Sequence, residues 1–155
     1  MTTRVLFICL GNICRSPTAE AVARQRLEGL PFEFDSAGTG NWHAGNTPDP
    51  RSITAGEARG YDFSGIRARQ VLPADFHRFE HLVAMDRDNL ETLHRMRPLN
   101  SRAQLHLMMD FTAGAIGRDV PDPYYRNDGF DDVLDIIEHA VEGLGITLAP
   151  PQLAD

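Results

Sequence analysis

The most constraining feature of this 155-residue chain is a short loop near its amino terminus, between an apolar run and a helix signal. The run Val5–Ile8 contains no polar residue, which is the pattern of a strand buried on both faces of a sheet. The loop Cys9–Ser16 follows, and Ser16 with Pro17 supplies an N-cap residue and a proline suited to the first helical position. This order of strand, loop and helix predicts the first unit of an α/β fold.

The rest of the chain continues the alternation of strands and helices. We expect further strands at residues 32–35, 81–85 and 105–108, and helices at residues 17–28, 51–59, 86–95 and 129–144. We find no internal repeat, linker or low-complexity segment. The pattern therefore predicts a parallel α/β sheet in one domain that spans residues 1–155.

The loop after the first strand has the chemistry of a phosphate site. Its backbone N–H groups can curl around a phosphate at a helix N-terminus, where the helix dipole favours negative charge. Arg15 adds a planar fork of donors, Gly11 permits a tight backbone, and the same field favours the nucleophilic thiolate of Cys9. The loop lacks the Gly-Lys-Ser/Thr ending of a nucleotide-binding loop. The candidate phosphate-binding residues are Leu10, Gly11, Asn12, Ile13, Cys14, Arg15 and Ser16.

A proton donor for the leaving oxygen is expected late in the chain. Asp122 lies between two prolines, which would hold it rigidly, and is followed by Tyr124 and Tyr125, which can receive a substrate ring. Asp49 stands in a rival Asp-Pro pair, but it runs directly into an expected helix start. We therefore interpret Asp49 as an N-cap and Asp122 as the acid.

Four motifs in sequence order resemble those of the low-molecular-weight protein-tyrosine phosphatases. They are Cys9–Ser16, Ser36–Thr39 with Trp42 downstream, Arg69–Val71 and Asp122–Tyr125, and the likeness covers nearly the whole chain. The resemblance implies a single three-layer α/β domain, with a four-stranded parallel sheet and helices on both faces. It also implies hydrolysis of phosphotyrosine and similar aryl phosphates on a tyrosine-phosphorylated protein, through a cysteinyl-phosphate intermediate.

The resemblance implies a role for each matched residue. Cys9 is expected to be the nucleophile, Arg15 the phosphate clamp, and Asp122 the general acid and then the base for the hydrolytic water. The residues expected to brace the loop by hydrogen bonds are Asn12, Ser16 and Ser36. The residues expected around the phenyl ring are Trp42, Tyr124 and Tyr125, with Leu10 and Ile13 at the rim. One departure is Ile66, where many family members have a histidine that bonds the loop asparagine, so we expect a rearranged network around Asn12.

Composition argues against several other partners. The net charge of −7 offers no basic stripe for nucleic acid, and the apolar run Val5–Leu10 is far too short for membrane insertion or a secretory signal. Two cysteines five positions apart do not make a disulfide framework, so we expect a cytoplasmic protein. We also expect no cofactor and a monomer or weak dimer.

We expect no metal site. The segment His77–His81 matches the spelling of an inverted zinc-protease motif, but it runs into an apolar strand, and we interpret it as ordinary strand-entry residues. The remaining histidines are predicted to lie on the surface: His43, His94, His106 and His139. Asp86 is interpreted as an N-cap with a solvated first turn rather than as part of a calcium loop.

Two alternative functions use the same loop. An arsenate reductase would pass oxidation to later cysteines, and none follows Cys14. A non-catalytic phosphate-binding or redox-sensing module would need no proton donor, which argues against it beside Asp122. Cys14 itself has two interpretations, a packing residue or a redox partner of Cys9.

Overall fold

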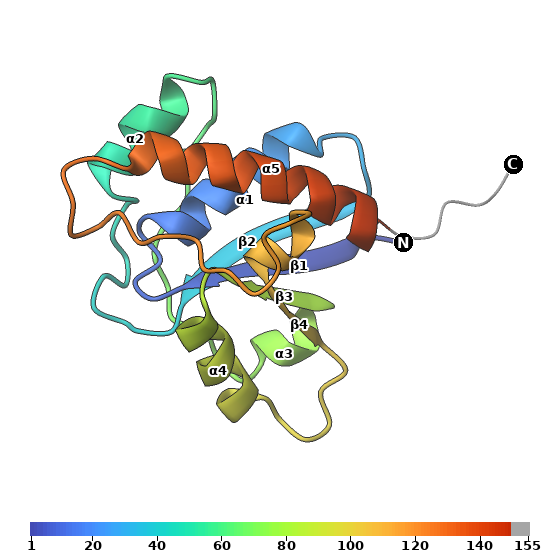
Figure 1. Ribbon diagram of the computed structural model, residues 1–155. Coiled ribbons are helices and arrows are strands. Elements are labelled where there is room, and N and C mark those ends of the chain that lie inside the picture. Colours follow the sequence, from blue (N-terminus) through green and yellow to red (C-terminus); the bar gives the residue numbers. More distant parts are fainter. Residues whose placement is uncertain (150–155) are drawn as a thin grey trace, which may run out of the picture.

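Four parallel strands form the central sheet, in the spatial order β2-β1-β3-β4 (Figure 1). The structure is a computed structural model that describes residues 1–149. The strands are β1 (Thr3–Cys9), β2 (Phe32–Gly38), β3 (His81–Ala84) and β4 (Gln104–Leu107). β1 is paired on both sides, and its residues Val5–Ile8 are completely buried, as their apolar run predicts.

Helices cover both faces of the sheet (Figure 1). They are α1 (Arg15–Arg26), α2 (Pro50–Glu57), α3 (Asp75–Arg78), α4 (Arg87–Met96) and α5 (Phe130–Leu148), with a 3-10 turn η1 at Met108–Phe111. Val5 and Phe7 point into the core that α1 and α5 cover, whereas Leu6 and Ile8 point into the core under α3 and α4. This alternation follows from the two-residue period of a strand. The expected three-layer α/β domain with a four-stranded parallel sheet is confirmed.

The expected start of the first helix is wrong. Helix α1 begins at Arg15, with Cys14 as its N-cap residue, so Ser16 is already inside the first turn. The Ser16 hydroxyl is used by the loop instead, because its Oγ accepts a hydrogen bond from Asn12 Nδ2 at 2.8 Å. Pro17 is still tolerated there, because the first-turn N–H groups of a helix have no intrahelical acceptor.

Other elements also differ from the sequence-based expectation, and α5 runs beyond its expected end at residue 144 to Leu148. β2 extends to Gly38, because its whole length pairs with β1 in register, from Thr3 with Phe32 to Cys9 with Gly38. The short helix α3 was not expected, and it places His77 in a helical turn before His81 opens β3. The N-caps Asp49 and Asp86 are confirmed, since their carboxylates accept from the backbone N–H of Arg51 and Asn89.

The carboxyl edge of the sheet is where the chemistry-bearing residues meet. β1 ends at Cys9 and β2 at Gly38, and Asp86 comes two residues after the end of β3. Adjacent parallel strands open their carboxyl ends into one crevice, which is the usual ligand site of such sheets. Gly38 makes the close approach possible, because a Cβ there would lie 2.7 Å from the Leu10 carbonyl oxygen. No helix within residues 1–149 is both long enough and apolar enough to cross a membrane.

Candidate active site

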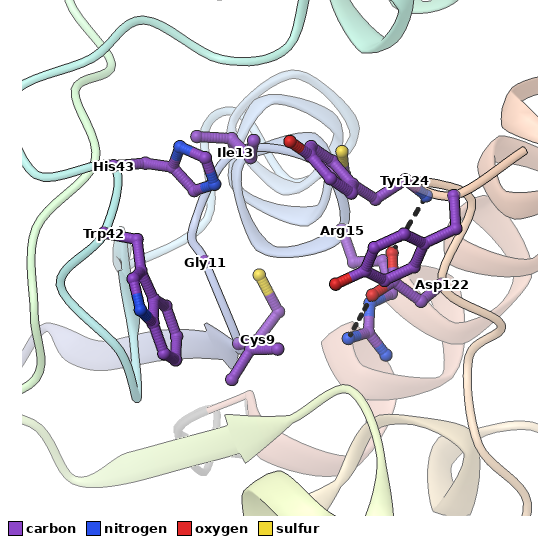
Figure 2. Close-up of a pocket in the computed structure, with 11 residues that line it drawn as sticks. Cys9, Gly11, Ile13, Arg15, Trp42, His43, Asp122 and Tyr124 are labelled. Carbon is purple, nitrogen blue, oxygen red and sulfur yellow. Dashed lines mark hydrogen bonds and ion pairs between the residues drawn. The ribbon is translucent and has the colours of Figure 1, made fainter.

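A cleft of about 300 Å³ opens at this edge of the sheet (Figure 2). It is lined by Cys9, Leu10, Gly11, Ile13, Cys14, Arg15, Trp42, His43, Asp122, Tyr124 and Tyr125. The loop residues form its floor, and the segments around Trp42 and Tyr124 face each other across it (Figure 2). The structure therefore brings the two most distant predicted motifs, the cysteine loop and the Asp122 segment, into one cavity.

The Cys9 sulfur is held by two hydrogen-bonding groups at the base of the cleft. Cys9 is 3% exposed, and its Sγ lies 3.0 Å from Ser16 Oγ and accepts from the Asn12 N–H at 3.2 Å. Hydrogen bonds to sulfur and the start of α1 both favour a negative charge at this atom. The sulfur is therefore fixed at the base of the cleft, where the loop and the start of α1 meet.

Asn12 shapes the loop from inside. Its φ of 56° is the left-handed conformation, which asparagine adopts more readily than most residues. The buried Asn12 amide donates to Ser16 Oγ at 2.8 Å and accepts from the Arg69 N–H at 3.0 Å. Ile66, at the position where a histidine is common in the resembling family, is buried in the apolar core. The Arg69 backbone thus supplies a bond to Asn12 in a network without that histidine.

Ser36 supports the loop less directly than expected. Its hydroxyl donates to Glu20 Oε1 on α1 at 2.6 Å and makes no hydrogen bond to residues 9–16. Burial raises the pKa of Glu20 above its usual value, against the opposing hydrogen bond from Ser36. A direct brace from Ser36 to the loop is therefore wrong, because the paired β2 strand holds this serine beside α1 instead.

Arg15 is almost completely buried among carboxylates and a carbonyl. Its Nη1 donates to Asp86 Oδ2 at 2.8 Å and to the Val120 carbonyl at 3.0 Å, and its Nη2 lies 3.6 Å from Asp122 Oδ2. Burial lowers the pKa of Arg15, but the charges of Cys9 and of these carboxylates outweigh it and leave that pKa above its usual value. The arginine remains a cation aimed at the loop.

The role of Asp86 was missed by the sequence interpretation, which assigned it to a solvated first turn. One carboxylate oxygen caps α4, and the other binds Arg15. A usable signal was present, because Asp86 follows a buried strand and the carboxyl ends of parallel strands share one edge.

Asp122 lies on the far side of the cleft from the loop backbone. Its Oδ1 accepts from the Tyr124 N–H at 3.0 Å, which leaves Oδ2 facing Arg15 and the cavity. The side chain is 31% exposed, so the carboxyl group is open to water. Asp49, the rival aspartate, does not line the cleft.

Aromatic rings form the two walls of the cleft (Figure 2). Trp42 and His43 stand on one side, and Tyr124 stands on the other, 5.9 Å from the His43 ring between centroids. Trp42 and Tyr125 are strongly exposed, as expected for a cleft mouth. His43 was predicted to be an ordinary surface residue, and that is wrong. The missing Cβ of Gly11 makes room for its ring, because an added Cβ would lie 3.0 Å from His43 Cδ2.

Cys14 is a buried free cysteine in the same loop. Burial raises the pKa of its thiol to about 12, and the charge of Asp49 adds to the effect. Cys14 is therefore a protonated thiol at neutral pH, in contrast to the hydrogen-bonded sulfur of Cys9.

The histidines do not form a metal centre in the part of the chain that the structure describes, where no three potential ligands come together. His81 and His106 do form a pair, with Nδ1 of the first 2.9 Å from Nε2 of the second. His106 is half-buried, so its predicted surface position is wrong. Its place on β4, diagonally opposite His81 on β3, explains the pairing.

One class of α/β proteins is defined by a buried strand that leads directly into a loop of the size that encloses an oxyanion. The loop begins with a cysteine and ends with an arginine. Members of this class bind a tetrahedral anion at a helix N-terminus beside a cysteine. A family model described as low molecular weight phosphotyrosine protein phosphatase matches residues 4–152. The chain belongs to this family, and the enzyme class predicted from the sequence is confirmed.

Individual relatives agree with the family match. A low molecular weight phosphotyrosine protein phosphatase of Schizosaccharomyces pombe is 44% identical over an alignment of 135 residues that covers 83% of this chain and 86% of that protein. A low molecular weight protein-tyrosine-phosphatase of Streptomyces coelicolor is 43% identical over 93% of this chain and 92% of its own. A crystal structure of a protein tyrosine phosphatase from Entamoeba histolytica, 41% identical, superposes with a TM-score of 0.87 over 95% of this chain and 97% of that one.

Proposed function

We propose that this protein hydrolyses phosphotyrosine on proteins through a cysteinyl-phosphate intermediate. One observation carries the proposal: Cys9, Arg15 and Asp122 meet in a single cleft between facing aromatic walls. A phosphate seated in the loop would have sulfur on one side and a carboxyl group on the other, which is the arrangement that an in-line displacement needs.

In the first proposed step, the Cys9 thiolate attacks phosphorus and the P–O bond to the tyrosine breaks. The loop N–H groups and Arg15 bind the equatorial oxygens, where charge accumulates in the transition state. Asp122, as a carboxylic acid, gives its proton to the departing phenolate oxygen. The hydrogen bonds from Ser16 and Asn12 keep the sulfur aimed into the loop.

In the second proposed step, water releases the phosphate. Asp122, now a carboxylate, takes a proton from a water molecule that attacks the phosphorus of the thiophosphate. The P–S bond breaks, inorganic phosphate leaves, and Cys9 returns to the thiolate. No cofactor is needed for this cycle.

The shape of the cleft supports an aryl phosphate as the substrate. Trp42 on one side of the cleft and Tyr124 on the other provide aromatic surfaces against which a phenyl ring can pack while its phosphate reaches Cys9 (Figure 2). A seryl side chain is shorter and offers no ring for these walls. We expect kcat/KM to be at least about 100-fold higher for a phosphotyrosine peptide than for the matched phosphoserine peptide. Comparable values for the two peptides would overturn the substrate assignment.

An assay of p-nitrophenyl phosphate hydrolysis distinguishes the proposed phosphatase from the two alternative functions. An arsenate reductase of the expected kind would need a further cysteine after Cys14, and the chain has two cysteines in all. A binding module would bind inorganic phosphate without turnover. Steady release of p-nitrophenol with catalytic turnover supports the phosphatase, and its absence in the reduced, phosphate-free protein rejects it.

Redox sensitivity is a further part of the proposal. Peroxide would oxidise the Cys9 thiolate to a sulfenic acid, and the Cys14 thiol would condense with it to a disulfide, releasing water. Because the pKa of Cys14 is about 12, we expect this capture to speed up as pH rises. Cys14→Ser should keep its activity but lose recovery by thiol after peroxide. Equal recovery in wild type and variant would leave Cys14 as a packing residue.

A reducing compartment such as the cytoplasm suits this chemistry, because Cys9 must be a free thiolate in the resting enzyme. We keep the monomer or weak dimer and the single domain over residues 1–155 as parts of the same proposal.

A further inference from the structure

The segment that carries Asp122 is packed against the protein at the buried Pro123 but makes few polar contacts with the rest of the chain. We call residues 121–128 the acid loop; it lies between η1 and α5. Its own hydrogen bonds are short-range, from the Tyr124 N–H to Asp122 and from the Arg126 N–H to the Pro123 carbonyl. Such contacts shape a turn but do not place it relative to the cleft.

Arg51 on α2 provides the hydrogen bonds that come from outside this loop. Its Nη1 donates to the Arg126 carbonyl at 2.6 Å, and its Nη2 donates to the Tyr124 carbonyl at 3.0 Å. Within residues 1–149, the only other polar contact that enters the acid loop is the 3.6 Å ion pair between Arg15 and Asp122. Arg51 therefore carries the hydrogen bonds that place this segment.

Aromatic rings hold the Arg51 guanidinium in place. Its Cζ lies 4.7 Å from the centroid of Phe130, at the start of α5, and 5.7 Å from the centroid of Tyr124. Arginine stacks on aromatic faces while its in-plane N–H groups remain free to donate. The stacking therefore restrains the Tyr124 ring that walls the cleft as well as the backbone beside it.

The other side of Arg51 leads back to the loop that follows β1, residues 9–16, which we call the phosphate loop. Its Nε and Nη2 donate to the two carboxylate oxygens of Asp49, at 3.0 and 2.9 Å. Asp49 in turn donates its backbone N–H to the Ile13 carbonyl at 2.8 Å. A continuous path of hydrogen bonds thus runs from the phosphate loop through Asp49 and Arg51 to the acid loop.

We propose that Arg51 is a positioning residue, which sets the place of the Asp122 carboxyl relative to the bound phosphate by tying the acid loop to the phosphate loop. Arg51 does not line the cleft, so it acts through Asp122 and not on the substrate. The inference rests on the proposed function, in which Asp122 protonates the leaving group. A guanidinium suits the task because it binds a carboxylate with one edge and two carbonyls with the other, whereas an ammonium is a single point donor.

The test compares leaving groups of different basicity. Phenyl phosphate needs protonation of its leaving oxygen, whereas p-nitrophenyl phosphate needs it much less, and kcat/KM covers the step that breaks the P–O bond. We expect Arg51→Gln to lower kcat/KM about 10-fold or more for phenyl phosphate and less than about 3-fold for p-nitrophenyl phosphate. Arg51→Lys should fall between wild type and Arg51→Gln. Competitive inhibition by inorganic phosphate should stay within about 2-fold of wild type in both variants.

Arg59→Gln is the matched control. Arg59 lies just after α2 and also bridges to neighbouring elements, with Nη1 2.7 Å from both Asp135 Oδ1 and Glu138 Oε1 on α5. Its exposure is similar, but it does not reach the acid loop. Loss of a bridging arginine in general would lower stability in both variants, whereas the leaving-group effect should appear only at Arg51.

The Asp122→Asn background separates this inference from the proposed function. There the acid is absent, so Arg51→Gln should add no further preference for p-nitrophenyl phosphate. An equal loss for both substrates in Arg51→Gln, or an undiminished selective loss in the Asp122→Asn background, overturns the positioning role. If Asp122→Asn itself shows no leaving-group selectivity, the proposed acid is wrong instead. If Arg51→Gln does not fold, the same comparison of phenyl phosphate with p-nitrophenyl phosphate is made with Arg51→Lys, and the same outcomes overturn the positioning role.

Discussion

The two loops that meet in the cleft are built in opposite ways. The phosphate loop, residues 9–16, is buried apart from Leu10 and Gly11 and is cross-linked by hydrogen bonds, with Asn12 1% and Ser16 0% exposed. The acid loop, residues 121–128, is open to water, with Tyr125 83% exposed, and is held by Arg51 from outside. The phosphate loop is also held from outside, by the N–H groups of Arg69 and Asp49, so the two loops differ in burial and in the number of hydrogen bonds that hold them.

The difference matches what each loop must contact. Every substrate of the proposed reaction presents the same tetrahedral phosphate, so a preformed ring of donors loses nothing by being rigid. The leaving group and the peptide around it vary, and residues exposed at the cleft mouth can meet them. Changes in the phosphate loop should therefore affect all substrates alike, whereas changes in the acid loop should depend on the leaving group.

The largest effect is expected in the phosphate loop, from Cys9→Ser. A serine hydroxyl is a far weaker nucleophile than a thiolate, so turnover of p-nitrophenyl phosphate should fall by more than about 10⁴-fold. Phosphate binding should survive, because Arg15 and the loop N–H groups remain. Calorimetric titration with inorganic phosphate checks the binding, and substantial residual turnover in the purified variant would reject the covalent mechanism.

The next largest effect belongs to the acid loop. Asp122→Asn removes the proton donor and should slow phenyl phosphate by about 10²–10⁴-fold, with a smaller loss for p-nitrophenyl phosphate. The measurement is kcat/KM over a series of phenols of graded acidity. An equal loss of kcat/KM for every phenol in the series would contradict the acid role of Asp122. It would also contradict the expectation that only acid-loop variants depend on the leaving group.

Asn12 allows a sharper test of the phosphate loop. Asn12→Ala loses the two amide hydrogen bonds and keeps a side chain at a φ of 56°, so kcat/KM should fall about 10- to 100-fold. Asn12→Gly loses the same bonds but relieves the backbone, and should fall less. Both losses should be the same for phenyl phosphate and p-nitrophenyl phosphate. If the loss of kcat/KM in the Asn12 variants depended on the leaving group, the proposed difference in role between the two loops would be contradicted.

The smallest effect lies outside both loops, at His106 on the edge strand β4. Burial, together with the charge of His81, lowers the pKa of His106 from 6.5 to about 4. Between these values the unfolded chain binds a proton that the folded protein does not, so stability falls as pH drops from about 6.5 towards 4.

The full pKa shift corresponds to about 2 kcal/mol between pH 7 and pH 4.5, and solvent screening at this half-buried site reduces it. We therefore expect His106→Gln to reduce the acid sensitivity by about 1 kcal/mol, or about 4 °C in Tm. His139→Gln, at an exposed position of α5, is the control and should leave the pH dependence of Tm nearly unchanged. Identical pH profiles for wild type and His106→Gln would show that the histidine pair does not contribute. Leaving-group selectivity should be unaffected in both variants, because neither residue reaches the cleft.

Much of the fold and the centre of the site can be predicted from the sequence, because their signals are local. The apolar run Val5–Ile8 predicts a buried strand from composition alone, and the spacing of Cys9 and Arg15 predicts an anion loop at a helix start. Asp49 and Asp86 each stand directly before an expected helix, and this position predicts an N-cap. Asp122 stands out because prolines flank it and tyrosines follow.

The errors share a different cause. Serine is a favourable residue type for an N-cap, but the Ser16 hydroxyl accepts a hydrogen bond from Asn12 in the loop, and the helix begins earlier, at Arg15. His43 has no local signal for the cleft, and the signal at Asp86, its place after a buried strand, does not identify Arg15 as its partner. His43 lines the cleft and Asp86 binds Arg15 only because the chain returns to the same edge of the sheet.

What the sequence by itself determined is the set of candidate groups: the proposed nucleophile, clamp and acid, and the strand and helix that frame the first two. Only the tertiary structure decided which groups complete the site. Arg15 meets Asp86 across 71 residues, and Arg51 meets the Tyr124 carbonyl across 73. Helix, strand and turn preferences act over a few neighbouring residues, whereas these partners depend on parallel strands delivering distant segments to one edge.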